Sequence, residues 1–314
     1  MVYQLSPPKL TGTSKWAESV IYYFGSQSQD GCKPTSTQLL FDKTTGSLFG
    51  TTELGGGTAG EGTLFQLTPP AESGSLWTET VLYRFTGGSD GGYPSGAITG
   101  NPDGGIVYGT TMYGGDGSGN GNGVVWAYYS AAPAEMTTIY YFQGGTDAAS
   151  PEGGVIGPYS YGPEGDSYYL LGTSPSGGGS ANCTNGCGTV YVINLPFLRD
   201  QLATDGILHA FQGLDGDSPM AGLAPIGGAY WGTTEGGGGS ANCGGFGCGT
   251  LFKIQVSGIT HLTLSYVHLY NLQGGVADGA FPSTGLAGDS SGNVFGLTTI
   301  GGANNLGTLF EYSP

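Results

Sequence analysis

The sequence predicts an all-β fold built from five repeated units, each of four short antiparallel strands. Three observations support this prediction. The chain of 314 residues contains 65 glycines, yet 38% of its residues are apolar and 12% are aromatic, which is enough apolar surface for a core. Short runs of aromatic and β-branched residues alternate with Gly, Pro, Asp and Asn. The same motifs return about every 60 residues along the whole chain.

Each unit contains four strand candidates in a fixed order. The first (a) is a short segment such as 285–289, and the second (b) carries Gly-Thr-Thr or a close variant. A Gly-Gly step and a short apolar run (c) follow, and a further apolar run (d) ends the unit. The b motifs begin at Gly50, Gly109, Gly172, Gly232 and Gly296, the c runs begin at Gly62, Gly123, Gly188, Gly249 and Gly307, and the d runs end at Phe24, Phe85, Phe142, Phe211 and Leu272.

Four-stranded sheets repeated radially make a β-propeller, so we expect a five-bladed β-propeller that occupies residues 1–314 as a single domain. A linear solenoid is the alternative, but its repeats are shorter and it needs capping units. The chain begins inside a repeat, so its N-terminal d strand is expected to close the last blade and remove a free edge. Units 1 to 5 span approximately residues 25–85, 86–142, 143–211, 212–272, and 273–314 together with 1–24.

One c strand is left over by this arrangement. The segment VYQLSPP at 2–8 is similar to FQLTPP at 65–70, while unit 5 has its own c strand, GTLFEY from Gly307. The surplus strand could be an artefact of where the chain starts, a cap on the last blade, or a strand offered to a neighbouring molecule. The last alternative predicts self-association through the N-terminal strand.

The repeat pattern ETVLYRFTGGSDGGYP, IVYGTTMYGG and GTLFQLTPP resembles the tandem repeats of the bacterial GloVer family over essentially the whole chain. This resemblance implies an exported protein with a propeller fold, often with a C-terminal surface anchor. No anchor pattern precedes the last residues, Tyr312-Ser313-Pro314. The resemblance does not imply a defined set of catalytic residues.

The charge balance restricts the partners. The chain has 23 Asp and Glu against 7 Lys and Arg, a net charge of −16. Binding to nucleic acid or to an anionic membrane needs clustered cations, so we expect neither. We also expect no membrane insertion, because no apolar run approaches the roughly 18 residues that span a bilayer. The first residues lack a signal-peptide pattern. We expect an extracellular or cell-surface protein whose partner is a polysaccharide or another cell-surface component.

In every unit, an Asp in the connection between strands d and a is followed four residues later by a Pro. An Asp side chain can bond to nearby backbone amides while the Pro fixes φ, which favours a structural role. The functional alternative is a ring of carboxylates at one mouth of the central channel, which would bind sugar hydroxyls or a structural cation such as calcium. We expect no other cofactor and predict no metal-binding residues. The pairs are Asp30 and Pro34, Asp90 and Pro94, Asp147 and Pro151, Asp215 and Pro219, and Asp278 and Pro282.

Aromatic and acidic residues near these connections are further candidates. Tyr93, Tyr113 and Phe246 lie among Asn, Asp and Gly, where exposed rings would suit carbohydrate. Glu53 and Glu235 occupy the same position, directly after Gly-Thr-Thr, in units 1 and 4. Two acids facing each other across a channel could act as acid and base, although Glu is also a common solvated loop residue.

The cysteines form two local pairs, Cys183 with Cys187 and Cys243 with Cys248, and leave Cys32 unpaired. Four cysteines from adjacent blades could bind zinc. A disulfide in each glycine-rich loop fits an exported protein better, and we predict disulfides. The histidines at positions 209, 261 and 268 lie in or beside d strands, where we expect structural roles.

Three functions follow from these observations. The leading one is a non-catalytic extracellular binding or surface-structural propeller that recognises its partner through the loop-rich face. The second is a secreted carbohydrate-active enzyme, a glycoside hydrolase or lyase, that uses acidic residues at the channel mouth. The third is an extracellular subunit that assembles through the surplus edge strand.

Overall fold

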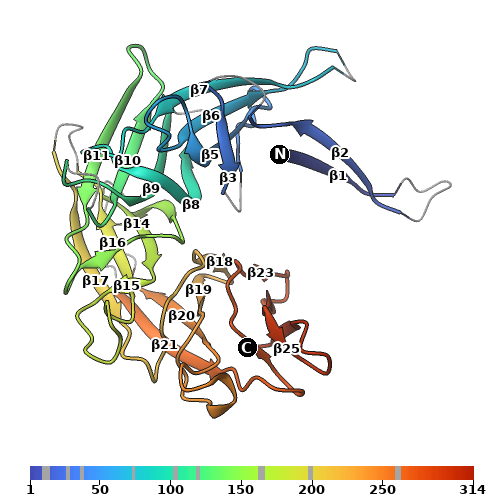
Figure 1. Ribbon diagram of the computed structural model, residues 1–314, viewed down its shortest axis with the longest axis vertical. Helices are drawn as coiled ribbons and strands as arrows, with labels where there is room; N and C mark the ends of the chain where they lie inside the picture. The colour runs from blue at the N-terminus through green and yellow to red at the C-terminus, as the bar shows by residue number, and fades with distance from the viewer. Residues whose placement is uncertain are drawn as a thin grey trace.

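The protein is an all-β five-bladed propeller, which confirms the predicted fold class. The computed structural model describes residues 1–8, 15–25, 29–35, 39–72, 75–101, 105–117, 121–161, 167–196, 201–258 and 263–314. The sheets follow one another in chain order around an arc, and the N-terminal hairpin and the last sheet lie at its two ends (Figure 1). Within the described residues, no helix is long and apolar enough to span a membrane.

The sheets of units 2, 3 and 4 have the expected hydrogen-bonded order a-b-c-d. Unit 2 contains β8 (Gly92–Asn101), β9 (Ile106–Tyr113), β10 (Val124–Tyr129) and β11 (Glu135–Tyr141); unit 3 contains β13 (Val155–Tyr161), β14 (Ser167–Ser174), β16 (Thr189–Asn194) and β17 (Thr204–Ala210); unit 4 contains β18 (Ala224–Ile226), β19 (Ala229–Thr234), β20 (Thr250–Ser257) and β21 (Thr263–Asn271).

Units 1 and 5 depart from this order. In unit 1, β3 (Gly31–Pro34) and β4 (Leu40–Phe41) both pair with β5 (Leu48–Gly55), which is followed by β6 (Thr63–Thr68) and β7 (Thr78–Arg84). Unit 5 has three strands, β23 (Ala287–Gly288), β24 (Val294–Leu297) and β26 (Leu309–Tyr312). Short additional pairs join β12 (Ala148–Ala149) to β15 (Ser176–Gly177) and β22 (Gly279–Ala280) to β25 (Ile300–Gly301), and η1 (Ala241–Cys243) is a 3₁₀ turn.

The predicted closure of the last blade by the N-terminal d strand is not formed in this structure. That strand, β2 (Ala17–Tyr22), pairs with β1 (Val2–Ser6), and β26 pairs with β24 alone among the described strands. The physical reason is that β1 is itself a c strand and precedes β2 closely in the chain. Pairing β2 with β1 therefore has a lower entropic cost of loop closure than pairing β2 with β26, which is almost 300 residues away in the sequence.

Two contacts explain why the b and c motifs recur. The Gly of each Gly-Thr-Thr motif lies under the aromatic ring of the adjacent c strand, and a Cβ at Gly50, Gly109, Gly172, Gly232 or Gly296 would overlap that ring. A second contact, repeated in four of the five units, joins hydroxyls of strands b and c, such as Thr52 with Thr63 and Thr234 with Thr250, each at 2.8 Å. These contacts hold the two central strands of a blade in register.

The apolar core lies between successive blades, as sheet packing in a propeller requires. Leu64 and Phe85 of unit 1 pack with Val107 and Trp126 of unit 2, and the same relation holds between the next units. A smaller cluster joins Ile226, Trp231 and Leu251 of unit 4 to Val294 of unit 5. The N-terminal hairpin packs on unit 1 through Val2 and Ile21, which contact Phe65 and Leu67.

The innermost strands of all five units surround one cavity of about 430 Å³. Its lining includes Leu40, Ile98, Val155, Leu223 and Leu286, one from each unit in chain order. The cavity is therefore the central channel of the propeller.

Candidate functional site

The five repeated Asp side chains are hydrogen-bonded within their own loops. Each carboxylate is hydrogen-bonded to the side chain two residues before the Phe or Leu that ends the d run, and to a backbone N–H of the loop. Asp90 accepts from the Tyr83 hydroxyl at 3.0 Å and from the Thr86 N–H at 2.9 Å. The same pairs are formed by Asp30 with Tyr22 and Gly25, Asp147 with Tyr140 and Gln143, Asp215 with His209 and Gln212, and Asp278 with Tyr270 and Gln273.

These contacts match the structural alternative for the Asp residues, because the carboxylates are occupied by turn hydrogen bonds. The residue before each Pro adopts a left-handed conformation, with φ between 53° and 58°. In units 2 to 5, its backbone N–H donates to a carbonyl of the preceding unit, as Tyr93 does to Glu61 at 2.9 Å and Ser218 does to Cys187 at 3.0 Å. The Asp-x-x-x-Pro loops therefore join neighbouring blades, and a ligand-binding role for their carboxylates stays a prediction.

The two cysteine-containing loops lie on either side of a groove of about 670 Å³. Disulfides link Cys183 to Cys187 and Cys243 to Cys248, as predicted. The groove is also lined by the d–a loop between them, which contributes Gln212, Leu214, Asp217 and Ser218. Phe246 lies at the groove with 74% of its side chain exposed. The predicted aromatic candidate in this loop is thus accessible.

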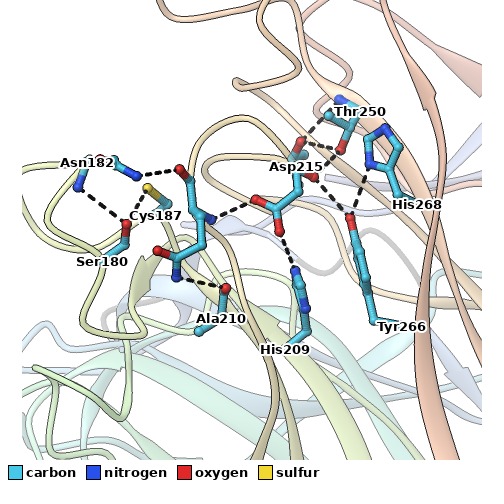
Figure 2. Close-up of polar contacts among 11 residues, drawn as sticks. Ser180, Asn182, Cys187, His209, Ala210, Asp215, Thr250, Tyr266 and His268 are labelled. Atoms are coloured by element: carbon cyan, nitrogen blue, oxygen red, sulfur yellow. Dashed lines mark hydrogen bonds and ion pairs between the residues drawn. The ribbon is translucent and has the colours of Figure 1, made fainter.

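Polar side chains hold the groove loops to each other (Figure 2). Asn182 Nδ2 donates to the Gln212 carbonyl at 2.8 Å, and Gln212 N–H donates to Asp215 at 2.7 Å. Asp215 also contacts His209 Nε2 at 2.8 Å, and the His209 ring stacks on Tyr266 with centroids 3.6 Å apart. The Tyr266 hydroxyl also donates to the Asp215 carbonyl at 3.0 Å, so a hydrogen-bonded path leads from β21 of unit 4 to the cysteine loop of unit 3.

Burial affects the pKa of two groups in this region. Burial lowers the pKa of His209, although the contact with Asp215 raises it. The neutral imidazole can still donate from Nε2 to Asp215, so the hydrogen bond needs no charge on the histidine. Burial raises the pKa of Asp217 in the groove wall, against the hydrogen bonds that Ser218 donates to it.

Two glutamates, from units 1 and 4, act on a third glutamate of unit 3 near the central channel. Burial raises the pKa of Glu152, and the negative charges of Glu235 and Glu53 raise it further. Units 1, 3 and 4 can bring carboxylates together only near the propeller axis, and Gly153, next to Glu152 in the chain, lines the channel. Glu53 also forms an ion pair with Lys33, at 3.6 Å. The two predicted acids therefore lie close enough to a third acid to perturb it.

Sequence reasoning missed Glu152, although a signal was present. The residue after each repeated Pro is Thr35, Ser95, Glu152, Met220 or Ser283 in units 1 to 5. The hydroxyls of Thr35 and Ser95 donate to the carbonyl oxygens of Pro94 and Pro151 in the next unit, at 3.1 and 2.9 Å. Glu152 replaces such a hydroxyl in unit 3. A departure from the repeat at this position could have identified it.

The remaining candidates lie apart from the groove. The Tyr93 and Tyr113 rings pack edge to face at 5.5 Å, and 43% of the Tyr113 side chain is exposed. Cys32 is unpaired and half-buried. Among the described residues, one cluster has metal-ligand spacing, Cys183 and Cys187 with Asp217, but both of its sulfurs are in a disulfide. His261 lies outside the described residues.

Comparisons with known proteins give distant structural similarities. No family model and no curated protein matches the chain. The GloVer resemblance therefore stays a prediction. A prolyl endopeptidase structure has a TM-score of 0.43 and 12% identity, covering 88% of this chain and 34% of its own. The inulosucrase from Halalkalicoccus jeotgali has a TM-score of 0.42 and 14% identity, covering 82% of this chain and 75% of its own. The α-L-arabinofuranosidase from Podospora anserina has a TM-score of 0.40 and 12% identity, covering 94% and 95% of the two chains.

Proposed function

We propose that the protein is an extracellular, non-catalytic propeller that binds an uncharged polysaccharide in the groove between its two disulfide-bonded loops. The observation that carries the proposal is Phe246, an exposed ring held at the edge of a preformed concave surface. Disulfides persist in oxidising compartments, which supports an exported protein. A cell-surface glycan is the partner that fits these features.

The groove has the size and the chemistry of a small-ligand site. Its volume of about 670 Å³ lies within the usual range of roughly 300–1,000 Å³. Amide side chains of Asn182, Asn185 and Gln212 line it and can both donate to and accept from sugar hydroxyls. An aromatic ring offers an apolar face to a partner that is polar at its edges.

The charge of the groove favours a neutral sugar. Its lining contains Asp217 and neither Lys nor Arg. The chain as a whole carries a net charge of −16, so a uronic acid or sulfated polymer would be repelled. Uncharged polymers such as xylan, arabinan, mannan or β-glucan avoid this repulsion.

Calorimetry or affinity electrophoresis with these four polymers, and with polygalacturonate and alginate as acidic polymers, tests the proposal. Phe246→Ala is expected to weaken binding about 10-fold, which corresponds to about 1.4 kcal/mol. Tyr168→Ala is the matched control, because Tyr168 is an exposed aromatic on β14 that does not line the groove. The proposal is wrong if Phe246→Ala binds as well as the parent protein, or if the acidic polymers bind best.

A second candidate function is hydrolysis or elimination at the channel mouth. The raised pKa of Glu152 supports it, because a carboxyl that holds its proton more strongly than an ordinary glutamate is better suited to act as a general acid. Glu53 or Glu235 would then be the second carboxyl of the catalytic pair. This candidate depends on the glutamate cluster, and the binding proposal depends on the groove, so the two can fail independently.

Incubation of the polymers with the protein, followed by assay of new reducing ends and unsaturated products, tests catalysis. Glu152→Gln is expected to lower the rate by about 10²–10⁴-fold if Glu152 is the acid. Glu72→Gln, an exposed glutamate far from the cluster in sequence, should retain full activity. If the parent protein releases no product from any polymer that it binds, the binding function stands and the catalytic one is rejected.

A further inference from the structure

A second groove, of about 540 Å³, lies between the b–c loops of units 2 and 3. Its lining includes Asn122 from the first of these loops and Asn185 from the second, with Ser150 of the d–a loop between them. The groove of the proposed function has the same construction one repeat later, with Ser218 in the place of Ser150. Each serine N–H donates to a carbonyl of the preceding b–c loop, Ser150 to Asn122 at 2.8 Å and Ser218 to Cys187 at 3.0 Å. The 2–3 groove and the 3–4 groove, as we call them, are thus one site of the repeat at two successive positions.

Small residues at two positions of the repeat keep these grooves open. One position is the residue before the repeated Pro, and the other is four residues after the Gly of the Gly-Thr-Thr motif. In unit 2, the Tyr93 and Tyr113 rings at these positions pack edge to face at 5.5 Å. In unit 5, Phe281 and Ile300 pack on an apolar cluster that includes Ala280. Small side chains in units 3 and 4 leave the equivalent space unfilled. The pairs in units 1 to 5 are Lys33 and Leu54, Tyr93 and Tyr113, Ser150 and Ser176, Ser218 and Gly236, and Phe281 and Ile300.

The first disulfide-bonded loop forms the wall that the two grooves share. The disulfide between Cys183 and Cys187 closes this loop, and Asn182 Nδ2 fixes it to the Gln212 carbonyl at 2.8 Å (Figure 2). The wall is therefore held in place, and a ligand chain that leaves one groove across the wall enters the other. The residues that line both grooves are Ser176, Thr184, Asn185 and Gly186.

Thr184 and Asn185 bring unused polar groups to this shared wall. Both residues are exposed, and neither side chain forms a hydrogen bond with another residue in the described part of the chain. A hydroxyl and a carboxamide can each donate and accept hydrogen bonds. The corresponding part of the second disulfide-bonded loop is Gly244-Gly245-Phe246. The shared wall therefore offers hydrogen bonds where the far wall of the 3–4 groove offers an aromatic ring.

The 2–3 groove suits an uncharged, hydroxyl-rich ligand. Its lining consists of Asn, Ser, Thr, Ala and Gly, with neither a charged nor an aromatic side chain. Such a surface can bond to sugar hydroxyls but offers no ring for stacking, so we expect it to bind a short oligosaccharide weakly. A chain already anchored at Phe246 presents its next residues to the 2–3 groove at a high effective concentration. The second groove then adds affinity that it does not provide alone.

We propose that the 2–3 groove is a second subsite for the same glycan. One linear, uncharged chain is anchored at Phe246 in the 3–4 groove, crosses the shared wall at Thr184 and Asn185, and continues into the 2–3 groove. The inference rests on the proposed function, because it needs a glycan in the 3–4 groove. It narrows the ligand class to polysaccharide chains, as opposed to monosaccharides or disaccharides.

Calorimetry with ladders of xylo-, arabino-, manno- and β-gluco-oligosaccharides, from the disaccharide upward, tests the second subsite. In the ladder that binds, the affinity of the parent protein should rise about 10²-fold between the shortest chains that bind and those that reach the 2–3 groove, and then level off. Long chains should bind with one chain per protein. This measurement needs no substitution, so it tests the proposal even if a variant fails to fold.

Ser150→Tyr gives unit 3 the residue that unit 2 carries at this position. The backbone accepts it, since Tyr93 and Ser150 have φ values of 56° and 53°. The ring should fill the 2–3 groove and abolish most of the gain in affinity with chain length. Ser218→Tyr should instead fill the 3–4 groove and weaken the binding of every length. Ser290→Tyr, the same change at an exposed serine that lines neither groove, should keep the gain.

The possible results separate the two proposals. If Phe246→Ala weakens binding but the parent protein binds short and long chains equally well, the second subsite is wrong and the binding function stands. A full gain with chain length in Ser150→Tyr also overturns the second subsite, because the added affinity then comes from elsewhere. Two chains bound per protein without any gain would show that the grooves act independently, which again contradicts it. If no neutral oligosaccharide or polymer binds, the proposed function fails and the second subsite fails with it.

Discussion

His209 stands where the other units carry a tyrosine. Tyr22, Tyr83, Tyr140 and Tyr270 donate a hydroxyl to the repeated Asp, and His209 makes the same contact from Nε2. Unlike tyrosine, histidine changes its charge near neutral pH. The connection between units 3 and 4 therefore contains a titratable version of a contact that the other connections make with a neutral group, and the loop it supports borders the groove.

This substitution within the repeat predicts a pH dependence of stability. Burial lowers the pKa of His209 in the folded protein, so the folded state prefers the neutral ring. The corresponding stability is present at neutral pH and falls as the pH drops below about 6.5, the ordinary histidine value, because the unfolded chain then binds more protons. His209→Tyr should keep the bond to Asp215 and remove this part of the decline.

Urea unfolding of the parent and the variant between about pH 5 and pH 8 checks the prediction. His268→Gln is the control, since His268 contacts Tyr266 and not Asp215 among the described contacts. It should keep most of the decline. Parallel profiles for the parent and His209→Tyr would show that the contact does not titrate in this range.

At the level of the secondary-structure elements, the two disulfides stiffen loops rather than blades. The equivalent b–c loops of units 1, 2 and 5 contain no cysteine and yet connect the same strands. Cys187 and Cys248 are fully buried, whereas Phe246 between Cys243 and Cys248 is exposed. The second disulfide therefore fixes the loop that presents the aromatic ring.

Removing that disulfide should affect binding more than folding. A loop of six residues contributes about 2 kcal/mol in the chain-entropy picture, so Cys243→Ala with Cys248→Ala should lower the free energy of unfolding by no more than this. Glycan affinity should fall further, because Phe246 must then be ordered on binding. Denaturation and calorimetry measure the two effects, and Cys32→Ser should change neither. Unchanged glycan affinity in the double variant would show that fixing this loop by the disulfide does not contribute to glycan binding.

The repeat pattern predicted the elements well because each motif makes a local contact within one blade. The Gly under the aromatic ring fixes the strands β5, β9, β14, β19 and β24 beside the adjacent c strands. Paired hydroxyls add to this contact in units 1, 3, 4 and 5. The Asp-x-x-x-Pro spacing was also predicted as a turn. In contrast, Glu152 acquires its environment from Glu53 and Glu235, which lie about 100 and 80 residues away in the sequence. Periodicity does not report such contacts.

At the scale of the whole molecule, blades 1 to 5 follow one another in chain order, and the N-terminal hairpin is an additional element that packs on unit 1. Its apolar contacts are Val2 and Ile21 against Phe65 and Leu67. Its polar contact is Asp30, which follows β2 and is 7% exposed, next to Glu79 on β7. Asp30 Oδ1 and Glu79 Oε1 are buried and have no hydrogen-bond partner among the described residues. Two carboxylates cannot bond to each other unless one keeps its proton.

Glu79 is the group expected to keep it, and this makes the attachment of the hairpin sensitive to pH. Burial, and then the charge of Asp30, raise the pKa of Glu79 from 4.5 to about 7, against the opposing effect of Arg84. The folded state therefore binds a proton that the unfolded chain releases. The stability this provides is complete below about pH 4.5 and is lost as the pH rises through about 7, opposite in sign to the effect of His209.

Glu79→Gln should remove this loss, because the amide can donate to Asp30 at every pH. The difference in unfolding free energy between variant and parent should therefore grow in favour of the variant between about pH 5 and pH 8. Hydrogen exchange of the β2 amides should slow in the variant over the same interval, since this contact holds β2 against unit 1. Glu18→Gln, the same change at an exposed position on β2, should show neither effect. If the two glutamine variants behave alike, the buried carboxyl pair does not share a proton, and the hairpin is attached by its apolar contacts alone.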